Sequence, residues 1–305
     1  MTNDTPDPRD TIAEFTRLLT VSLDGDGHLT GIPQPGGVGR VFGGQVIAQA
    51  LQAAQAAASE GMVPHSLHAY FLRGGTEGLD TRFEVIRDLD GRSFANRRVI
   101  ARQGGEVILT LTASLQHPED GLEHQDAVMP DVPPPEDLQS DHDQRHELIA
   151  RIGEQMSEAQ RALFLRPRPI DLRSVGKLHW KSREPSPPHA RSWFRTVAPL
   201  PDDPALHRAA IAYVSDYTLL GTAALPHGLS WFRQELTGAS LDHALWFHRP
   251  ARADEWLLYV TDSPWSGGGR GFNRGMIFDR AGHLIASVAQ EGMMRRRRPR
   301  SAGKD

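Results

Sequence analysis

The chain contains one order of segments twice, and this repeat restricts its possible folds more than any other feature of the sequence. In the first half, residues 41–57 (VFGGQVIAQALQAAQAA) are small or apolar on nearly every face, which predicts a buried helix that begins at a glycine pair. Four runs rich in β-branched and aromatic residues follow, and they predict strands over residues 66–74, 81–90, 92–103 and 106–116. In the second half, residues 214–228 occupy the helix position, and strands are predicted over residues 240–250, 255–263, 270–280 and 284–295. Each half is therefore expected to form a curved antiparallel sheet wrapped around one central helix.

Short local similarities set the register between the two halves. HAYFLR resembles HALWFHR, FANRRV resembles FNRGMI, and the turn QGGEVI resembles AGHLI. In this register Gly44 aligns with Asp216 and Ala113 aligns with Gln290, so the first half lacks both polar side chains. We also expect an earlier strand in each half, over residues 22–31 and 175–196.

A linker divides the halves. Residues 118–137 (PEDGLEHQDAVMPDVPPPED) are rich in proline and acidic residues and poor in apolar ones, and the segment after them has apolar residues at helical spacing. We therefore expect an N-terminal unit at residues 1–117, a linker with a bridging helix at 118–165 and a C-terminal unit at 166–295. Residues 296–305 are expected to form a basic, disordered tail.

Composition excludes several classes of protein. The sequence has no cysteine, which removes disulfides, thiol nucleophiles and cysteine-ligated metal sites, and is compatible with the reducing cytoplasm where we expect the protein. No stretch approaches the roughly 18 consecutive apolar residues of a membrane span, and the N-terminus (MTNDTPDPRD) lacks the pattern of an export signal. A net charge of −4, with basic residues gathered at the tail, argues against a nucleic-acid-binding domain.

Two further motifs are better explained by structure than by ligand binding. His142 and His146 lie four residues apart on the bridging helix, but no glutamate of a zinc-hydrolase motif stands between them, so a solvated helix face is favoured over a metal site. The glycine-rich segments GGVGRVFGG and SGGGRGFNRG have neither dinucleotide-binding nor phosphate-loop spacing. The residues thus indicate neither a metal nor a nucleotide cofactor.

Several motifs in a fixed order carry a resemblance to a known family. VFGGQVIAQAL, HSLHAYFLR, GRSFANRRVIA, SLDHALWFHRP, EWLLY, GRGFNRG and SVAQEGMMR together resemble the type II acyl-CoA thioesterases, over residues 41–295. The resemblance implies an α+β double hotdog fold, in which two tandem repeats join into one continuous sheet. It also implies hydrolysis of fatty acyl-CoA to free fatty acid and CoA without a metal or other cofactor. Acyl-CoA is then the expected partner, and we expect a homo-oligomer.

The same resemblance implies three catalytic residues that hold the attacking water. Matched by motif, they are Asp216 in VSDY, Ser240 in ASLDHALWF and Gln290 in VAQEG. Ser240 stands where the family often has threonine, but it keeps the hydroxyl group. The sequence itself favours water as the nucleophile, since it has no cysteine and no G-x-S-x-G motif. Arg270 and Arg274 are candidates for contacting the CoA phosphates, with a turn or surface ion pairs as the alternative.

Asp216 can also be interpreted as a helix cap, since it stands just before the apolar run at 219–225. Its absence from the first repeat favours catalysis, although glycine is itself tolerated at helix caps. Two other functions on this fold stay open: a non-catalytic acyl-thioester binder or sensor, and a hydratase. The three polar residues argue against the binder, and the absence of histidine between Tyr213 and Gly221 argues against the hydratase. Asp242 and His243 are adjacent in a predicted strand and point to opposite faces, so SLDH does not form a serine triad.

Overall fold

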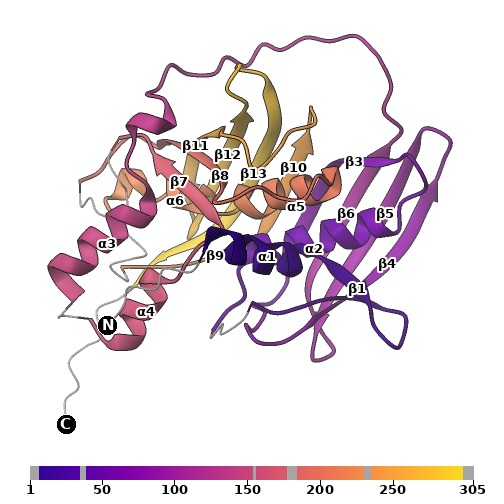
Figure 1. Cartoon of the computed structure of the whole chain (residues 1–305), viewed down its shortest axis with the longest axis horizontal. Coiled ribbons are helices and arrows are strands. Elements are labelled where there is room, and N and C mark those ends of the chain that lie inside the picture. Colours follow the sequence, from indigo (N-terminus) through magenta and orange to yellow (C-terminus); the bar gives the residue numbers. More distant parts are fainter. Residues whose placement is uncertain (1–6, 35–38, 154–155, 177–183, 230–234, 298–305) are drawn as a thin grey trace.

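A computed structural model describes residues 7–34, 39–153, 156–176, 184–229 and 235–297 (Figure 1). Its strands form one antiparallel sheet in the order β1-β2-β4-β5-β6-β3-β10-β13-β12-β11-β8-β7, and β9 pairs with β13 outside this path. The predicted continuous sheet is confirmed, because β3 of the first half pairs directly with β10 of the second half.

In each half a central helix and four strands after it appear in the predicted order, and α1 and β9 are elements that were not predicted. The first half comprises α1 (Pro8–Leu19), β1 (Val21–Leu23), β2 (Leu29–Gly31), α2 (Gly43–Ala56), β3 (Val63–Phe71), β4 (Thr81–Asp90), β5 (Phe94–Gln103) and β6 (Glu106–Gln116). The connection contains η1 (Pro135–Asp137), α3 (Asp141–Ile152) and α4 (Glu158–Leu165). The second half comprises β7 (Ile170–Ser174), β8 (His189–Thr196), α5 (Pro204–Ser215), α6 (Leu219–Thr222), η3 (Leu225–His227), β9 (Leu236–Ser240), β10 (Asp242–Phe247), β11 (Leu257–Gly267), β12 (Arg270–Phe278) and β13 (Leu284–Arg296).

The sheet buries one face against the helices. Along β6 every second residue from Leu109 to Leu115 is buried, as expected for a strand with one covered face. The strands expected at 81–90 and 106–116 have the predicted bounds. The early strand expected over residues 22–31 is two strands, β1 and β2, which flank the turn at Gly27, where φ is 80°. Of the strand expected over residues 175–196, the structure has β8 at the end of that range, whereas β7 precedes the range and residues 177–183 lie outside the described range of the chain. Residues 298–305 of the expected tail also lie outside it.

The central helices α2 and α5 lie side by side on one face of the sheet (Figure 1). They are antiparallel, because Gln55 at the end of α2 donates to the carbonyl of Ala205 at the start of α5, at 3.3 Å. Close approach is possible because the facing surfaces are built largely of alanine and glycine, with Ala50, Ala53, Ala209 and Ala210 fully buried. This packing brings the N-terminus of α2 to the C-terminus of α5.

The position of α5 corrects the predicted second helix. The central helix is Pro204–Ser215, so Asp216 follows its last residue and is not at a helix start. The sequence signal for the true start is Asp203 before Pro204, an aspartate N-cap whose side chain accepts from the Ala205 amide at 2.9 Å. Gly44 lies in the first turn of α2, and the predicted alignment of Gly44 with Asp216 therefore matches opposite helix ends.

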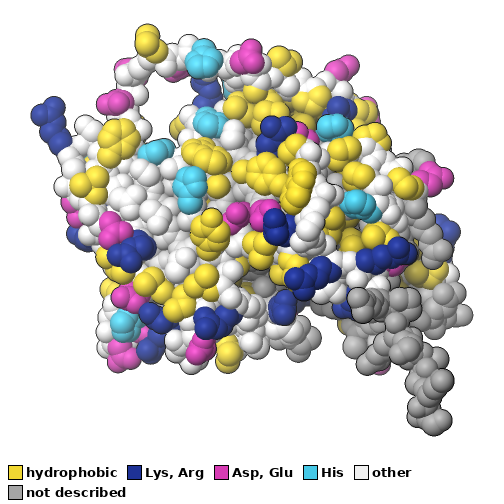
Figure 2. Space-filling view, turned by 180° about the vertical axis from the view of Figure 1, so that it is seen from behind, with side chains coloured by type: hydrophobic (Ala, Val, Ile, Leu, Met, Phe, Trp, Pro, Cys, Tyr) yellow, Lys and Arg dark blue, Asp and Glu magenta, His cyan; other side chains and the backbone are white. Residues whose placement is uncertain are grey.

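The reverse side of the molecule shows hydrophobic side chains interspersed with arginine and histidine (Figure 2). Among the large hydrophobic side chains of the described residues, Tyr70 and Trp265 are 62% and 46% exposed. None of the helices in the described ranges has the length and apolar character needed to cross a bilayer.

Candidate active site

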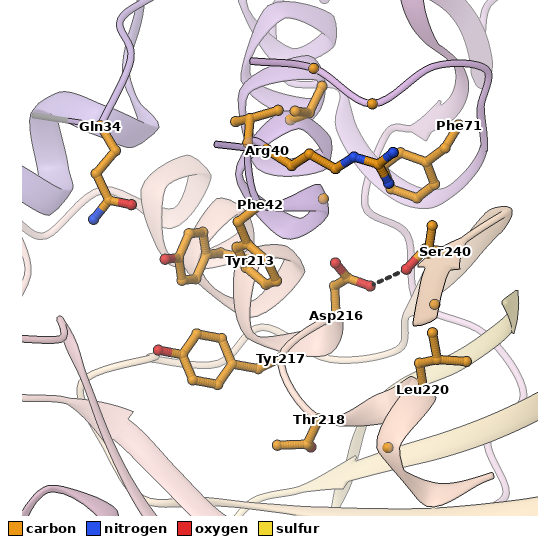
Figure 3. Close-up of a pocket in the computed structure, with 18 of the residues that line it drawn as sticks. Gln34, Arg40, Phe42, Phe71, Tyr213, Asp216, Tyr217, Thr218, Leu220 and Ser240 are labelled. Atoms are coloured by element: carbon orange, nitrogen blue, oxygen red, sulfur yellow. Dashed lines mark hydrogen bonds between the residues drawn. The ribbon is translucent and has the colours of Figure 1, made fainter. Parts of the chain in front are cut away.

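A cavity of about 830 Å³ opens where the two halves meet. Its wall includes Phe42 and Phe71 from the first half, and Tyr213, Asp216 and Ser240 from the second (Figure 3). The wall combines apolar side chains with charged and polar ones, so a hydrocarbon chain could lie along its apolar part while polar groups of a ligand meet the charged part.

Asp216 projects into this cavity from the end of α5. Its carboxylate accepts a hydrogen bond from the Gly44 amide in the first turn of α2, where the helix dipole favours negative charge. The glycines allow this approach, since a Cβ at Gly43 would lie 2.7 Å from Asp216 Oδ2 and one at Gly44 would lie 2.4 Å from the Tyr213 carbonyl. Asp216 thus stabilises the start of a helix, but this is α2 of the other half and not the run at 219–225 that the cap interpretation concerned.

Ser240 and Gln290 both donate to the same oxygen of Asp216. Ser240 Oγ lies 3.2 Å from Asp216 Oδ1, and Gln290 Nε2 lies 2.5 Å from that atom. Ser240 ends β9 and Gln290 lies in β13; these strands pair through Ser240 and Gly292. The structure therefore brings together the three residues that the resemblance implied.

Burial raises the pKa of Asp216 to about 6, and hydrogen bonds from Gln290, Ser240 and Gly44 oppose this rise by stabilising the ionised form. The carboxylate is therefore mostly ionised at neutral pH, with a pKa close enough to neutrality for it to accept a proton from water.

His243 extends the network behind Gln290, on the side away from the cavity. Its Nδ1 lies 3.0 Å from Gln290 Nε2, and its Nε2 lies 2.8 Å from Ser215 Oγ. The Ser215 hydroxyl donates to the Ala212 carbonyl, so its oxygen must accept from the Nε2 proton of His243. Nδ1 is then an acceptor, and burial lowers the pKa of His243 to about 3, which keeps the ring neutral.

This pattern determines which way the Gln290 amide faces. Its NH₂ group meets two acceptors, Asp216 Oδ1 and His243 Nδ1, and a flipped amide would set its oxygen against the carboxylate. Gln290 Oε1 is buried and has no hydrogen-bond partner among the described residues. The same holds for Oδ1 of Asn273, which pairs with Gln290 across strands β12 and β13. The Oε1 atom of Gln290 can therefore still accept a hydrogen bond.

The opposite end of the helix pair, where α2 ends beside the start of α5, carries different side chains from those around Asp216. Ala57 is the C-terminal cap of α2, and its carbonyl accepts a hydrogen bond from Arg97 Nε at 3.0 Å. Arg97 is fully buried. Arg97 pairs across the ladder with Ala113, as Asn273 pairs with Gln290. The matching end of the first half thus contains a guanidinium and an alanine instead of an acid and an amide.

Arg270 and Arg274 are not among the residues that line the cavity. Arg270 pairs with Glu291 at 3.0 Å, and Arg274 Nε pairs with Asp262 at 3.0 Å. These are the surface ion pairs that the sequence left open as an alternative, and a role in CoA binding stays a prediction. No group of three or more histidine or acidic side chains in the described ranges is arranged to hold a metal ion.

Comparison with known proteins identifies the family. A profile described as "Acyl-CoA thioesterase" matches residues 178–293, and one described as "Acyl-CoA thioesterase N-terminal domain" matches residues 32–116. The chain is 35% identical over 290 residues to "Acyl-CoA thioesterase 2" of Haemophilus influenzae, covering 94% of this chain and 98% of that protein. This chain belongs to the type II acyl-CoA thioesterase family.

Other relatives of the thioesterase agree with this assignment. "Acyl-coenzyme A thioesterase 8" of Rattus norvegicus is 38% identical, covering 84% of this chain and 80% of its own. The crystal structure of an acyl-CoA thioesterase II, TesB2, from Mycobacterium marinum superposes with a TM-score of 0.73 at 39% identity, covering 92% of this chain and 98% of that one. The double hotdog fold expected from the sequence is confirmed.

Sequence reasoning missed four parts of this site. Helix α5 could have been found from its Asp-Pro start, at Asp203. The contact of Gly44 with Asp216 and the link from His243 to Gln290 had no local signal, because each joins segments far apart in the chain. The arginines on the cavity wall, which are Arg40, Arg73, Arg145, Arg166 and Arg168, were also missed.

Proposed function

We propose that this thioesterase hydrolyses fatty acyl-CoA to a free fatty acid and CoA, by direct attack of water. The observation that carries the proposal is the ionised Asp216, which lines the cavity and is held there by an amide and a hydroxyl that both donate to one of its oxygens. Membership of the family supports acyl-CoA as the substrate.

In the proposed reaction Asp216 removes a proton from water as the water oxygen attacks the thioester carbon. The carbonyl oxygen becomes an oxyanion, and the N-terminal end of α2 faces this region with the positive end of its dipole. The tetrahedral intermediate then collapses by breaking its carbon–sulfur bond. CoA leaves as a thiolate, which takes up a proton from Asp216 or solvent, and the acyl group leaves as the fatty acid.

Ser240 and Gln290 hold Asp216 in one orientation, and Gln290 Oε1 supplies a second acceptor for the hydrogens of the attacking water. We assign these three catalytic residues to the C-terminal unit, 166–295, and a supporting role to the N-terminal unit, 1–117, which contributes the start of α2. A homo-oligomeric state and a cytoplasmic location remain predictions from the sequence.

The direct test follows thiol release from acyl-CoA esters of increasing chain length. The wild-type protein should release CoA, and Asp216→Asn should lose about 10²- to 10⁴-fold in kcat because asparagine cannot accept the proton. A matched control is Asp262→Asn, which removes a carboxylate from the surface pair with Arg274. Binding of acyl-CoA by folded wild-type protein without any thiol release would identify a binder or sensor instead.

A further inference from the structure

An arginine wall stands between the main cavity and a smaller neighbouring one. Arg145, Arg166 and Arg168 line both the 830 Å³ cavity and a 250 Å³ cavity against α3, α4 and β7. Asp141 is the single acidic residue of that shared wall.

Arg168 carries a positive charge that Asp141 does not neutralise. Arg145 forms a buried ion pair with Asp141, and Arg168 has no ion pair among the described residues. Arg168 instead lies over the Tyr217 ring, with 5.7 Å between guanidinium carbon and ring centroid, so its position is fixed by an uncharged partner.

Placing these guanidinium groups together is costly. Burial and, after it, the positive charge of Arg168 lower the pKa of Arg145 to about 10, although the carboxylate of Asp141 acts in the opposite direction. A bound anion would offset this repulsion, and a guanidinium pairs with phosphate oxygens in a two-pronged geometry.

We propose that Arg168, with Arg145 and Arg166 beside it, binds the phosphate groups of the CoA moiety. This inference rests on the proposed function, since acyl-CoA must be the ligand of the main cavity. A fatty acyl chain and the pantetheine arm carry no charge, so the phosphates are the part of such a substrate that an arginine cluster can recognise. Tyr217 adjoins both Asp216 in sequence and Arg168 in space, which joins the wall to the reaction centre.

Two other cationic positions compete for this role. Arg40 also lines the cavity without an ion pair among the described residues, but it projects from the segment before α2 toward Phe71 (Figure 3), and it does not line the smaller cavity that the other three arginines share. Arg270 was the candidate from sequence, but it does not line the cavity, and it is paired with Glu291 on the surface. CoA carries several phosphate charges, which favours the site where several guanidinium groups converge.

The test compares two substrates with the same acyl chain, acyl-CoA and acyl-pantetheine, which lacks all phosphates. In Arg168→Gln, the KM for acyl-CoA should rise about tenfold or more, and the KM for acyl-pantetheine should stay unchanged, with kcat retained on both. Arg168→Lys should show an intermediate loss, because it keeps the charge but not the planar fork. Arg98→Gln is the matched control, since it removes the same charge from an exposed surface pair with Asp88.

The outcomes separate this inference from the proposed function. If the wild-type protein hydrolyses neither substrate, the proposed function fails. If it hydrolyses both and Arg168→Gln changes the two KM values equally, the arginine wall does not bind the phosphates. The inference then fails, while the proposed function stands. A phosphate-specific loss in Arg40→Gln or Arg270→Gln, with Arg168→Gln unaffected, would place the phosphates at that residue and overturn the inference.

Discussion

Gln290→Met tests how the amide acts on Asp216. Methionine is close to glutamine in length and suits a fully buried position, but it donates no hydrogen bond. Gln290 stabilises the ionised carboxylate, so its removal should raise the pKa of Asp216 above the present value of about 6. Since the reaction needs the ionised form, the rising limb of kcat against pH should move to higher pH.

The size of the shift follows from the contact. A hydrogen bond to a charged group contributes about 1.5–3 kcal/mol, and one pKa unit corresponds to about 1.4 kcal/mol, so the limb should move upward by about one to two units. From a pKa of about 6, the ionised fraction at pH 7 would fall from about 90% to between about 50% and 10%. The plateau at high pH should fall as well, because the attacking water loses an acceptor.

The assay follows loss of the ultraviolet absorbance of the thioester bond from about pH 5 to about pH 9, since this signal does not depend on thiol ionisation. Ser240→Ala is the matched comparison: its hydrogen bond to Asp216 is 3.2 Å long against 2.5 Å for Gln290, so its limb should move less. A Gln290→Met limb that stays near pH 6 would refute the assignment of Gln290 as the donor that controls Asp216.

Three further predictions concern the fold and the network around the site. Asp216→Asn should stabilise the protein at neutral pH. Burial raises the pKa of this carboxyl from 3.8 to about 6, so its ionisation above pH 6 lowers the free energy of unfolding by at most about 3 kcal/mol, and asparagine removes this loss. The melting temperature should therefore rise by a few degrees at pH 7.5, and this gain should vanish below about pH 4; an equal gain at both pH values would contradict the reasoning. His243→Leu should lower kcat about tenfold or more with little change in KM. His243→Asn should recover most of the lost kcat, because its Oδ1 can replace Nδ1 as the acceptor for Gln290. Equal losses of kcat in both variants would mean that His243 acts only through packing. A fragment of residues 1–116 should aggregate, because it exposes the β3 edge that pairs with β10, and a soluble monomer in light scattering would argue against this dependence.

The fold was largely readable from the sequence, because its main signals are local. The alternating pattern of β6 and the small and apolar residues that predominate in α2 are properties of neighbouring residues, and both segments form as predicted. The predicted start of the second helix was wrong because apolar spacing at 219–225 outweighed the Asp203-Pro204 signal. That apolar run forms only the short α6 and a turn of η3 beside the cavity.

The identities of Asp216, Ser240 and Gln290 were available from the sequence through the family motifs, but their chemistry was not. A carboxylate with a pKa of about 6 requires burial, and burial arises only when α5 ends against the start of α2 from the other half. The orientation of Gln290 likewise depends on His243 in a different strand, and the arginine wall forms only when the connecting helices pack beside the second half. Residue types and local spacing thus determined the elements and the candidate groups, whereas tertiary packing decided proton affinity and hydrogen-bond direction, because both depend on atoms that are distant in sequence and close in space.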